Sequence, residues 1–266
     1  MTQKQLAALL PSLPTTPGVY QWWDENGLLL YVGKAKNLRA RLAQYRRAKR
    51  REKMFKVVKA GHKLTWETCE NDLAACLREV ELIQTAKPKK NVASAYSCRY
   101  PFLGIKVEGI TTVFCFSTVP SSLPEFRFFG TFRSRENTTE ALGALARLLR
   151  YVGHQERIEE DFPSYSYGYA FRRVPEPIRL EIEQLWLGHS SDILATLFAR
   201  LLEHAGARAN AAEVKEDLRW LRTFWEEEAR PLRQAIERTQ FAAYPVPQTD
   251  RDPLFLRAKI LPSEGA

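Results

Sequence analysis

The chain has 266 residues, of which 45% are apolar and 11% aromatic, so it is long enough for two or three modules with hydrophobic cores. The net charge of +9 comes from one segment, because residues 34–63 hold 13 Lys or Arg and a single acid, Glu52. No run approaches the ~20 apolar residues of a membrane span, and Leu6–Leu10 is too short for a signal-peptide core. We therefore expect a cytoplasmic protein.

Two β-rich runs open the chain. Gly18–Trp23 and Leu28–Val32 are joined by Asp24–Gly27, in which Asn-Gly is a strong hairpin signal. A third run with strand character is Lys63–Cys69. Residues 1–98 thus predict an α+β domain, in which a three-stranded antiparallel sheet is flanked by helices.

The first of these helices begins after Asn37, a good N-cap residue, because Leu38, Leu42 and Tyr45 recur at near-helical spacing. Arg41 then lies about one turn into the helix. The helix also carries the start of the basic segment, which suits a phosphate backbone, although a charge run alone can be a solvated helix face.

A second helix is predicted from Asn71 or Asp72, either of which can cap it, up to Pro88. Its apolar residues recur at helical spacing. Glu79 lies close to this apolar stripe, whereas Glu81 points elsewhere by about 200° of helical rotation. Glu79 is therefore the candidate functional carboxylate.

Residues 99–177 predict a small α/β module. Apolar runs at 100–107, 112–116 and 126–132 precede a helix-like stretch at 138–151. The aromatic and basic segment 159–174 has no clear period. Its tyrosines could stack on nucleic-acid bases, but an irregular connector is an equal reading.

The sequence predicts a helical region over residues 178–240 and a tail over residues 241–266. Amphipathic patterns cover 178–186, 192–205 and 211–238. The tail contains several prolines and is expected to be a surface strap or partly disordered.

Four residue types in the first domain suit phosphodiester hydrolysis, which needs an activated water and charge stabilisation on the phosphoryl oxygens. Glu79 can hold one Mg²⁺, and Arg41 offers a planar donor fork to phosphate. Tyr20 and Tyr31 can accept a proton only if nearby positive charge lowers the phenol pKa. Lys34 and Arg41 are expected to supply that charge.

The order of these residues along the chain resembles that of a known protein family. Gly18-Val19-Tyr20, the run Tyr31–Arg41, Glu79 and Asn91 follow one another, and this set resembles the GIY-YIG nuclease domain. The Tyr-Val-Gly-Lys-Ala-Lys-Asn-Leu run is most similar to the amino-terminal domain of the UvrC excinuclease family, which includes short Cho-like homologues.

The resemblance implies roles for these residues. Tyr31 matches the proposed general base, Arg41 the arginine that contacts the scissile phosphate, and Glu79 the metal ligand. Further matches to active-site positions are Tyr20, Lys34, Tyr45 and Asn91, and Gly18 and Gly33 belong to the structural motif. The candidate DNA-binding residues of the basic segment are Lys36, Asn37, Arg39, Arg46, Arg47, Lys49, Arg50, Arg51 and Lys53.

Each match has a simpler reading when taken alone. Tyr20 and Tyr31 could be half-buried strand aromatics, Glu79 a surface acid and Asn91 a turn residue. The combination, in order and followed by a basic helix, favours the nuclease.

The resemblance also implies a cofactor and partners. One Mg²⁺ (or Mn²⁺) ion is expected, whereas zinc and an iron-sulfur cluster are not, because the four cysteines show no such ligand spacing. Residues 99–177 resemble the UvrC region after the nuclease domain, and 178–240 a degenerate UvrB-binding hairpin. The implied substrate is damaged double-stranded DNA, with the UvrA/UvrB damage-recognition complex as a candidate partner.

The sequence therefore predicts an endonuclease of nucleotide excision repair that makes a single incision, on the 3′ side. The alternatives are a GIY-YIG endonuclease with another role, mobile-element or structure-specific, and a non-catalytic DNA-binding scaffold.

Overall fold

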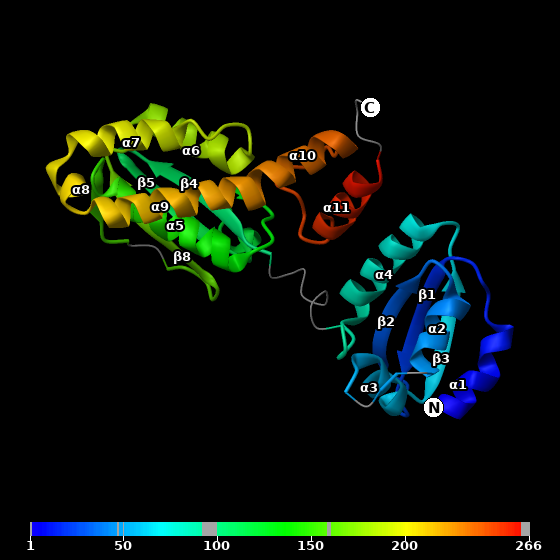
Figure 1. The fold of residues 1–266 in the computed structure, drawn as a ribbon. Helices are drawn as coiled ribbons and strands as arrows, with labels where there is room; N and C mark the ends of the chain where they lie inside the picture. Colours follow the sequence, from blue (N-terminus) through cyan, green and yellow to red (C-terminus); the bar gives the residue numbers. More distant parts are fainter. Residues whose placement is uncertain (1, 47, 50, 92–99, 159–160, 262–266) are drawn as a thin grey trace. The chain divides into compact units, whose positions relative to one another are not determined.

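The computed structural model describes residues 2–46, 48–49, 51–91, 100–158 and 161–261. The chain divides into two compact units, Met1–Ser97 with Lys259–Ala266, and Cys98–Ala258 (Figure 1). Arg47, Arg50 and the sequence-based domain boundary at residue 98 lie outside the described residues. No helix in the described part of the chain is long and apolar enough to cross a membrane.

The first unit is built on a three-stranded antiparallel sheet of order β2-β1-β3, as the sequence predicts. Its elements are α1 (Gln3–Leu9), a 3-10 turn (Leu10–Ser12), β1 (Gly18–Trp23), β2 (Leu29–Ala35), α2 (Leu38–Arg46), α3 (Lys53–Ala60), β3 (Lys63–Thr68) and α4 (Asp72–Ala86). Helices α1 and α3 were not predicted.

The turn between β1 and β2 follows from its sequence. Asp24 Oδ1 accepts the backbone N–H groups of Asn26 and Leu28 at 2.9 and 2.8 Å, and Gly27 takes a φ of +77°. Strand β2 continues three residues past Val32, its predicted end, because Ala35 still pairs with Gly18 of β1. The Tyr-Val-Gly-Lys motif therefore lies on the strand itself.

The core of the first unit fixes α2 and α3 against the sheet. Trp22 and Tyr45 are almost fully buried there, as are Leu38 and Leu42 on the inner face of α2. Helix α4 begins at its N-cap Asn71, whose Oδ1 accepts the Ala74 N–H at 2.9 Å. Helices α2 and α4 thereby bring Arg41 and Glu79 to the sheet.

The second unit contains a five-stranded antiparallel sheet of order β6-β4-β5-β8-β7 and several helices. The strands are β4 (Phe102–Glu108), β5 (Thr111–Ser117), β6 (Arg127–Gly130), β7 (His154–Glu156) and β8 (Ser166–Arg172). A 3-10 turn (Pro120–Ser122) precedes β6. The helices are α5 (Arg135–Leu149), α6 (Glu176–Leu187), α7 (Ile193–Glu203), α8 (Ala205–Ala209), α9 (Ala211–Phe224), a π-helical turn (Trp225–Ala229), α10 (Arg230–Thr239) and α11 (Arg251–Ile260).

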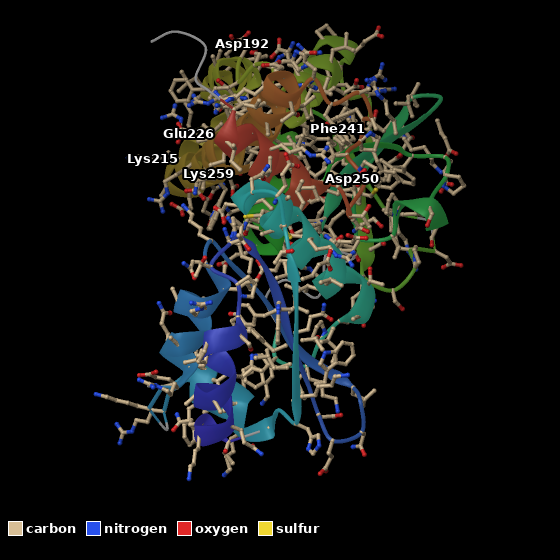
Figure 2. All side chains as sticks on the ribbon, turned by 90° about the vertical axis from the view of Figure 1, so that its right-hand side faces the viewer. Asp192, Lys215, Glu226, Phe241, Asp250 and Lys259 are labelled. Carbon is tan, nitrogen blue, oxygen red and sulfur yellow. The ribbon has the colours of Figure 1, made fainter. Side chains whose placement is uncertain are left out.

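Two interpretations of this unit were wrong. Residues 166–172 are not an irregular connector but strand β8, which pairs with β5 on one side and β7 on the other. The tail is not a bare strap, because it forms α11, and Val246 and Leu254 join the main core. That core also contains residues from both sides of the sequence-based boundary at 177. Charged side chains are exposed on this unit, among them Asp192 before α7, Lys215 on α9 and Glu226 in the π-helical turn (Figure 2).

Candidate active site

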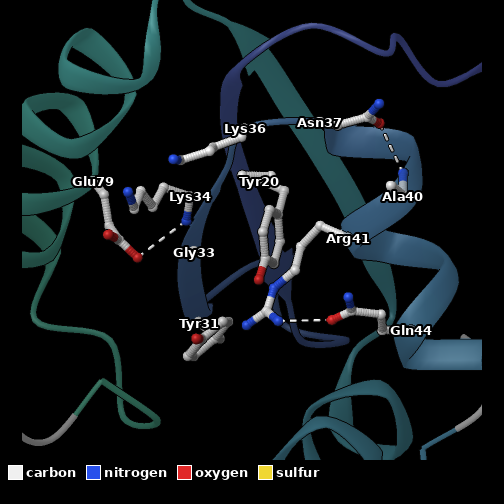
Figure 3. Close-up of a pocket in the computed structure, with 11 residues that line it drawn as sticks. Tyr20, Tyr31, Gly33, Lys34, Lys36, Asn37, Ala40, Arg41, Gln44 and Glu79 are labelled. Atoms are coloured by element: carbon white, nitrogen blue, oxygen red, sulfur yellow. Dashed lines mark hydrogen bonds between the residues drawn. The ribbon is translucent and has the colours of Figure 1, made fainter.

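A cavity of about 540 Å³ in the first unit collects most of the predicted site residues (Figure 3). Strands β1 and β2, helix α2 and helix α4 each supply part of its wall. The lining residues are Tyr20, Tyr31, Gly33, Lys34, Ala35, Lys36, Asn37, Ala40, Arg41, Gln44 and Glu79.

Tyr20 forms the buried floor of the cavity. Its phenol oxygen lies 2.9 Å from that of Tyr45, and the Tyr45 ring stacks on Trp22 at 5.8 Å between centroids. Burial raises the pKa of both phenols. Tyr45, predicted as an active-site residue, is therefore placed behind Tyr20 and does not line the cavity.

Tyr31 is half-buried and more accessible than Tyr20. Its ring centroid lies 6.3 Å from that of Tyr20, and the Lys53 ammonium lies 5.0 Å from the Tyr31 ring centroid. Burial, with the nearby Tyr20 and Glu79, raises the pKa of Tyr31 to about 12, and a hydrogen bond with Tyr45 and the charge of Arg41 oppose that rise.

Arg41 thus acts on the Tyr31 pKa in the expected direction, but burial outweighs it and the pKa is raised overall. The Lys34 ammonium instead lies 3.0 Å from Asp72 Oδ1. Burial alone would lower the Lys34 pKa, but hydrogen bonds to Cys76 and Asp72 outweigh it, so that pKa is raised.

Arg41 is held in place at the edge of the cavity. Asn37 caps its helix by accepting the Ala40 N–H at 2.9 Å, and Arg41 donates to Gln44 Oε1 at 2.8 Å. A hydrogen bond with the Tyr20 phenol raises the pKa of the guanidinium. Arg41 therefore offers a fixed cation to an anionic group in the cavity.

Glu79 faces these groups from α4, as Figure 3 shows. Its Oε1 accepts the Lys34 backbone N–H at 3.0 Å. Burial raises its pKa, and the Lys34 amide together with the charges of Lys34, Arg41 and Lys53 opposes that shift. Among the described residues no group of three or more His, Cys, Asp or Glu could hold a metal ion.

The donor set fits Mg²⁺ rather than a closed protein metal site. Magnesium binds through one or two carboxylates and keeps several waters that substrate phosphate can displace. A single carboxylate at the wall of an open cavity, beside a fixed arginine, meets that requirement.

Gly33 is required by the close approach of Tyr20. The two residues pair across β1 and β2, and a Cβ at position 33 would collide with the Tyr20 hydroxyl and ring.

Gly18 has no place in the cavity wall. A Cβ there would collide with the Glu67 carbonyl and lie 2.7 Å from Leu38, so this glycine permits strand and helix packing.

Asn91 also acts behind the cavity. It is 8% exposed, and its amide both accepts from the Val32 N–H at 2.9 Å and donates to the Val32 carbonyl at 2.8 Å. It therefore extends the hydrogen bonding of β2, beside Tyr31 and Gly33. The sequence predicted an active-site role for Asn91, and in this structure its side chain supports strand β2.

The predicted DNA-binding residues divide into two groups. Lys36 and Asn37 line the cavity, whereas the exposed Arg46, Lys49, Arg51 and Lys53 follow along the chain. Arg39 differs from these because it donates to the Leu13 and Pro11 carbonyls at 2.8 and 3.0 Å, which ties α2 to the preceding 3-10 turn.

Sequence reasoning missed two polar neighbours of the site, Gln44 and Asp72. Both could have been found from helical spacing. Gln44 lies three residues after Arg41 on α2, and Asp72 lies two turns before Glu79 on α4, so each shares a helix face with a recognised residue.

Comparisons with known proteins show what this chain is similar to. A family model described as a UvrC-like GIY-YIG domain matches residues 16–92. UvrABC system protein C of Gloeobacter violaceus is 30% identical over 217 residues, which cover 77% of this chain and 35% of that protein. The corresponding protein of Porphyromonas gingivalis is 32% identical over 133 residues, 50% of this chain and 22% of that protein.

The chain thus spans 35% or less of the length of these two relatives. A solved structure, the GIY-YIG N-terminal endonuclease domain of UvrC from Thermotoga maritima bound to magnesium as its catalytic divalent cation, is 31% identical. It covers 34% of this chain and 99% of that one, with a TM-score of 0.31. Residues 16–92 of this chain therefore match a UvrC-like GIY-YIG domain.

Proposed function

We propose that this protein is a Mg²⁺-dependent DNA endonuclease that hydrolyses a phosphodiester bond by direct attack of water. The observation that carries the proposal is the meeting of Tyr31, Arg41 and Glu79 in one open cavity. These side chains come from three different elements, so the cavity unites a proton acceptor, a phosphate-binding fork and a carboxylate.

Glu79 would hold the ion, which when bound supplies positive charge beside the phosphate and an acidified water. Arg41, fixed by Gln44 and Tyr20, binds the phosphoryl oxygens and stabilises the charge that develops on them. Lys34 adds a second cation to the same wall.

Tyr31 orients the attacking water and accepts its proton. The pKa of Tyr31, about 12, leaves the phenol protonated at neutral pH. Positive charge beside it would favour the phenolate, the form that can accept a proton. A cation held by Glu79 would add to that charge.

The biological role is proposed from the relatives, which are named as components of the UvrABC system. We infer a single incision, on the 3′ side of a lesion in double-stranded DNA, in cooperation with a UvrA/UvrB damage-recognition complex in the cytoplasm. The basic segment of residues 34–63 supplies the charge for duplex binding.

The test is strand scission of an end-labelled duplex with one bulky lesion, in the presence of Mg²⁺ and the damage-loading partners. We expect wild type to make one cut and Glu79→Ala to lose at least about a hundredfold in rate, because the ion loses its protein ligand. Glu81→Ala, which removes an exposed acid from the same helix, is the matched control and should cut normally.

Binding of the uncut duplex by Glu79→Ala should persist, since that binding belongs to the basic segment. Cutting by wild type that does not depend on the lesion would favour a structure-specific or mobile-element nuclease. Binding without any cutting by wild type would contradict the catalytic proposal in favour of a scaffold.

A further inference from the structure

Asp72 bridges two cavity lysines from the first turn of α4. Its Oδ1 lies 3.0 Å from the Lys34 ammonium and its Oδ2 lies 3.8 Å from that of Lys36. The Asp72 and Lys34 side chains are each 34% exposed, whereas Lys36 is 81% exposed. The closer pair is therefore partly shielded from solvent, and the longer one belongs to the surface.

Helix α4 contacts Lys34 both at its backbone N–H and at its side-chain ammonium. Asp72 precedes Glu79 by seven residues, or about two turns, so their side chains lie on the same face of the helix. Glu79 binds the Lys34 backbone N–H at 3.0 Å, and Asp72 binds the ammonium at the far end of the side chain. Cys76, one turn after Asp72, is a further neighbour that raises the Lys34 pKa.

This arrangement has two opposing consequences for an anionic substrate. A negative charge beside Lys34 and Lys36 reduces the attraction of both lysines for phosphate. The same charge removes the freedom of a long, flexible side chain, which would otherwise adopt many rotamers in an open cavity. Figure 3 shows both lysine side chains extending toward α4, away from Arg41.

We propose that Asp72 is a positioning residue that holds Lys34 in register with Glu79 and in doing so weakens binding of DNA. The proposal rests on the nuclease function proposed above. Replacing a purely structural residue would weaken DNA binding and slow cutting together. Removing the Asp72 charge should instead strengthen DNA binding and slow cutting.

The test compares wild type with Asp72→Asn, which is nearly isosteric. The N-cap of α4 is Asn71 and stays intact, so the helix keeps its start. Duplex binding is measured in EDTA, without cutting, across a series of salt concentrations. The single-turnover cutting rate is then measured with Mg²⁺ and saturating DNA.

We expect Asp72→Asn to bind the duplex about two- to fivefold more tightly at low salt, the range of a partly exposed ion pair. We expect its single-turnover rate to fall about tenfold, since Lys34 is no longer held. Asp72→Glu, which keeps the charge, should restore both values to within about threefold of wild type.

Glu70→Gln is the matched control. It removes an exposed carboxylate from the segment just before α4 and leaves the Lys34 pair intact. We expect it to cut like wild type and to bind DNA with less than a twofold change. An equal effect of Glu70→Gln and Asp72→Asn would overturn the proposal, because net charge alone would then explain both.

Two further outcomes would overturn the positioning role. One is an Asp72→Asn protein that cuts as fast as wild type, and the other is weaker binding together with slower cutting, as a partly unfolded domain would show. A wild type that fails to cut would instead overturn the proposed nuclease function, so the two failures are distinguishable.

Discussion

Glu79 lies within the field of Lys34, Arg41 and Lys53, yet its pKa is raised. Burial is the largest cause, and the neighbouring cations and the Lys34 amide oppose it without cancelling it. The ionised carboxylate is therefore less stable in the fold than in the unfolded chain. A site of this kind favours capture of a cation, because the ion supplies the charge compensation that the protein leaves incomplete.

This imbalance predicts a pH-dependent stability difference between wild type and Glu79→Gln. Because the folded pKa lies above the unfolded value near 4.5, folding favours the protonated acid. Its contribution to stability is fully present below pH 4.5 and is lost as the pH rises through the folded pKa. Without metal, Glu79→Gln should be the more stable protein at pH 7, and the difference should vanish toward pH 4.

Urea unfolding between pH 4 and 8 measures the difference, and Mg²⁺ should reverse it. An ion at 100 times its Kd adds about 2.7 kcal/mol to wild type at pH 7 and much less to the variant. A metal-free Glu79→Gln that is less stable than wild type at pH 7 would contradict this account of the carboxylate.

At this scale the sequence predicted which residues lie together better than how deeply each is buried. Tyr20, Tyr31, Arg41 and Glu79 meet in the cavity because their order along the chain reflects one fold. Tyr45, however, lies one layer deeper, and a motif records residue order but not depth. The raised pKa of Tyr31 was equally hidden, because burial and the proximity of Tyr20 and Glu79 depend on packing that the motif does not specify.

At the scale of elements, α3 continues the basic surface of the segment 34–63. The helix buries Val57 and Val58 and exposes Lys56 and Lys59 on the opposite side. Lys53, at its first turn, places its ammonium 5.0 Å from the Tyr31 ring centroid. The row of lysines thus begins at the cavity and leads away from it.

We predict that Lys56→Gln/Lys59→Gln weakens duplex binding through lost phosphate contacts. Each contact contributes about 0.9 to the slope of log K against log salt concentration, so the slope should fall by about 1.8. The single-turnover cutting rate at saturating DNA should stay within about twofold of wild type, since neither lysine lines the cavity.

The control for this pair is Lys4→Gln/Lys89→Gln, which makes the same change in net charge at exposed positions outside the segment 34–63. Binding is measured by fluorescence anisotropy from about 50 to 200 mM salt. Equal slopes for the two double variants would show that α3 makes no specific phosphate contact.

Strand β8 and helix α11 show why some elements were not predicted from the sequence. In β8, Phe171 packs into the main core and Ala170 into the cluster on the other face of the sheet, so no alternation of polar and apolar residues remains. In α11, Pro253 suggested a break, but proline is tolerated in the first turn of a helix. Contacts distant in sequence secure that turn, since the Tyr100 phenol donates to Asp252 at 2.8 Å.

At the scale of the whole molecule, the first compact unit follows the predicted first domain, whereas the segments expected to form a second module, a helical region and a tail mostly share the second unit. Amphipathic periodicity showed that the segments after residue 178 bury one face, but not against which partner. In the structure Phe132 of the α/β region packs on Phe224 of α9 at 4.8 Å between centroids. The Val246 N–H, far along the chain, donates to the Gly130 carbonyl at 2.9 Å. Only such long-range contacts define the second unit.

Glu228 is the polar residue on which we expect this second unit to depend. It is 4% exposed and accepts the backbone N–H groups of Arg133 and Ser134 at the start of α5. Its charge also acts on the buried guanidinium of Arg251. Burial raises the pKa of Glu228, as it does that of Glu79, but Glu228 accepts a backbone N–H group on each of its two oxygens, whereas Glu79 accepts one. Glu228→Gln would therefore place an amide donor against one of those N–H groups and leave Arg251 without this carboxylate, so we expect a loss of about 2 to 4 kcal/mol.

The loss should lower the unfolding free energy of the second unit while the cavity of the first unit keeps its geometry, because the residues of the two cores are distinct. Glu227→Gln is the matched control. Its exposed carboxylate accepts from Asn137 Nδ2 at 3.0 Å, a bond that glutamine can also accept, so its effect should stay within about 0.5 kcal/mol. Urea unfolding followed by tryptophan fluorescence, with DNA cutting measured below the transition, separates the two effects. Equal stability of the two variants would mean that the buried carboxylate does not hold the start of α5.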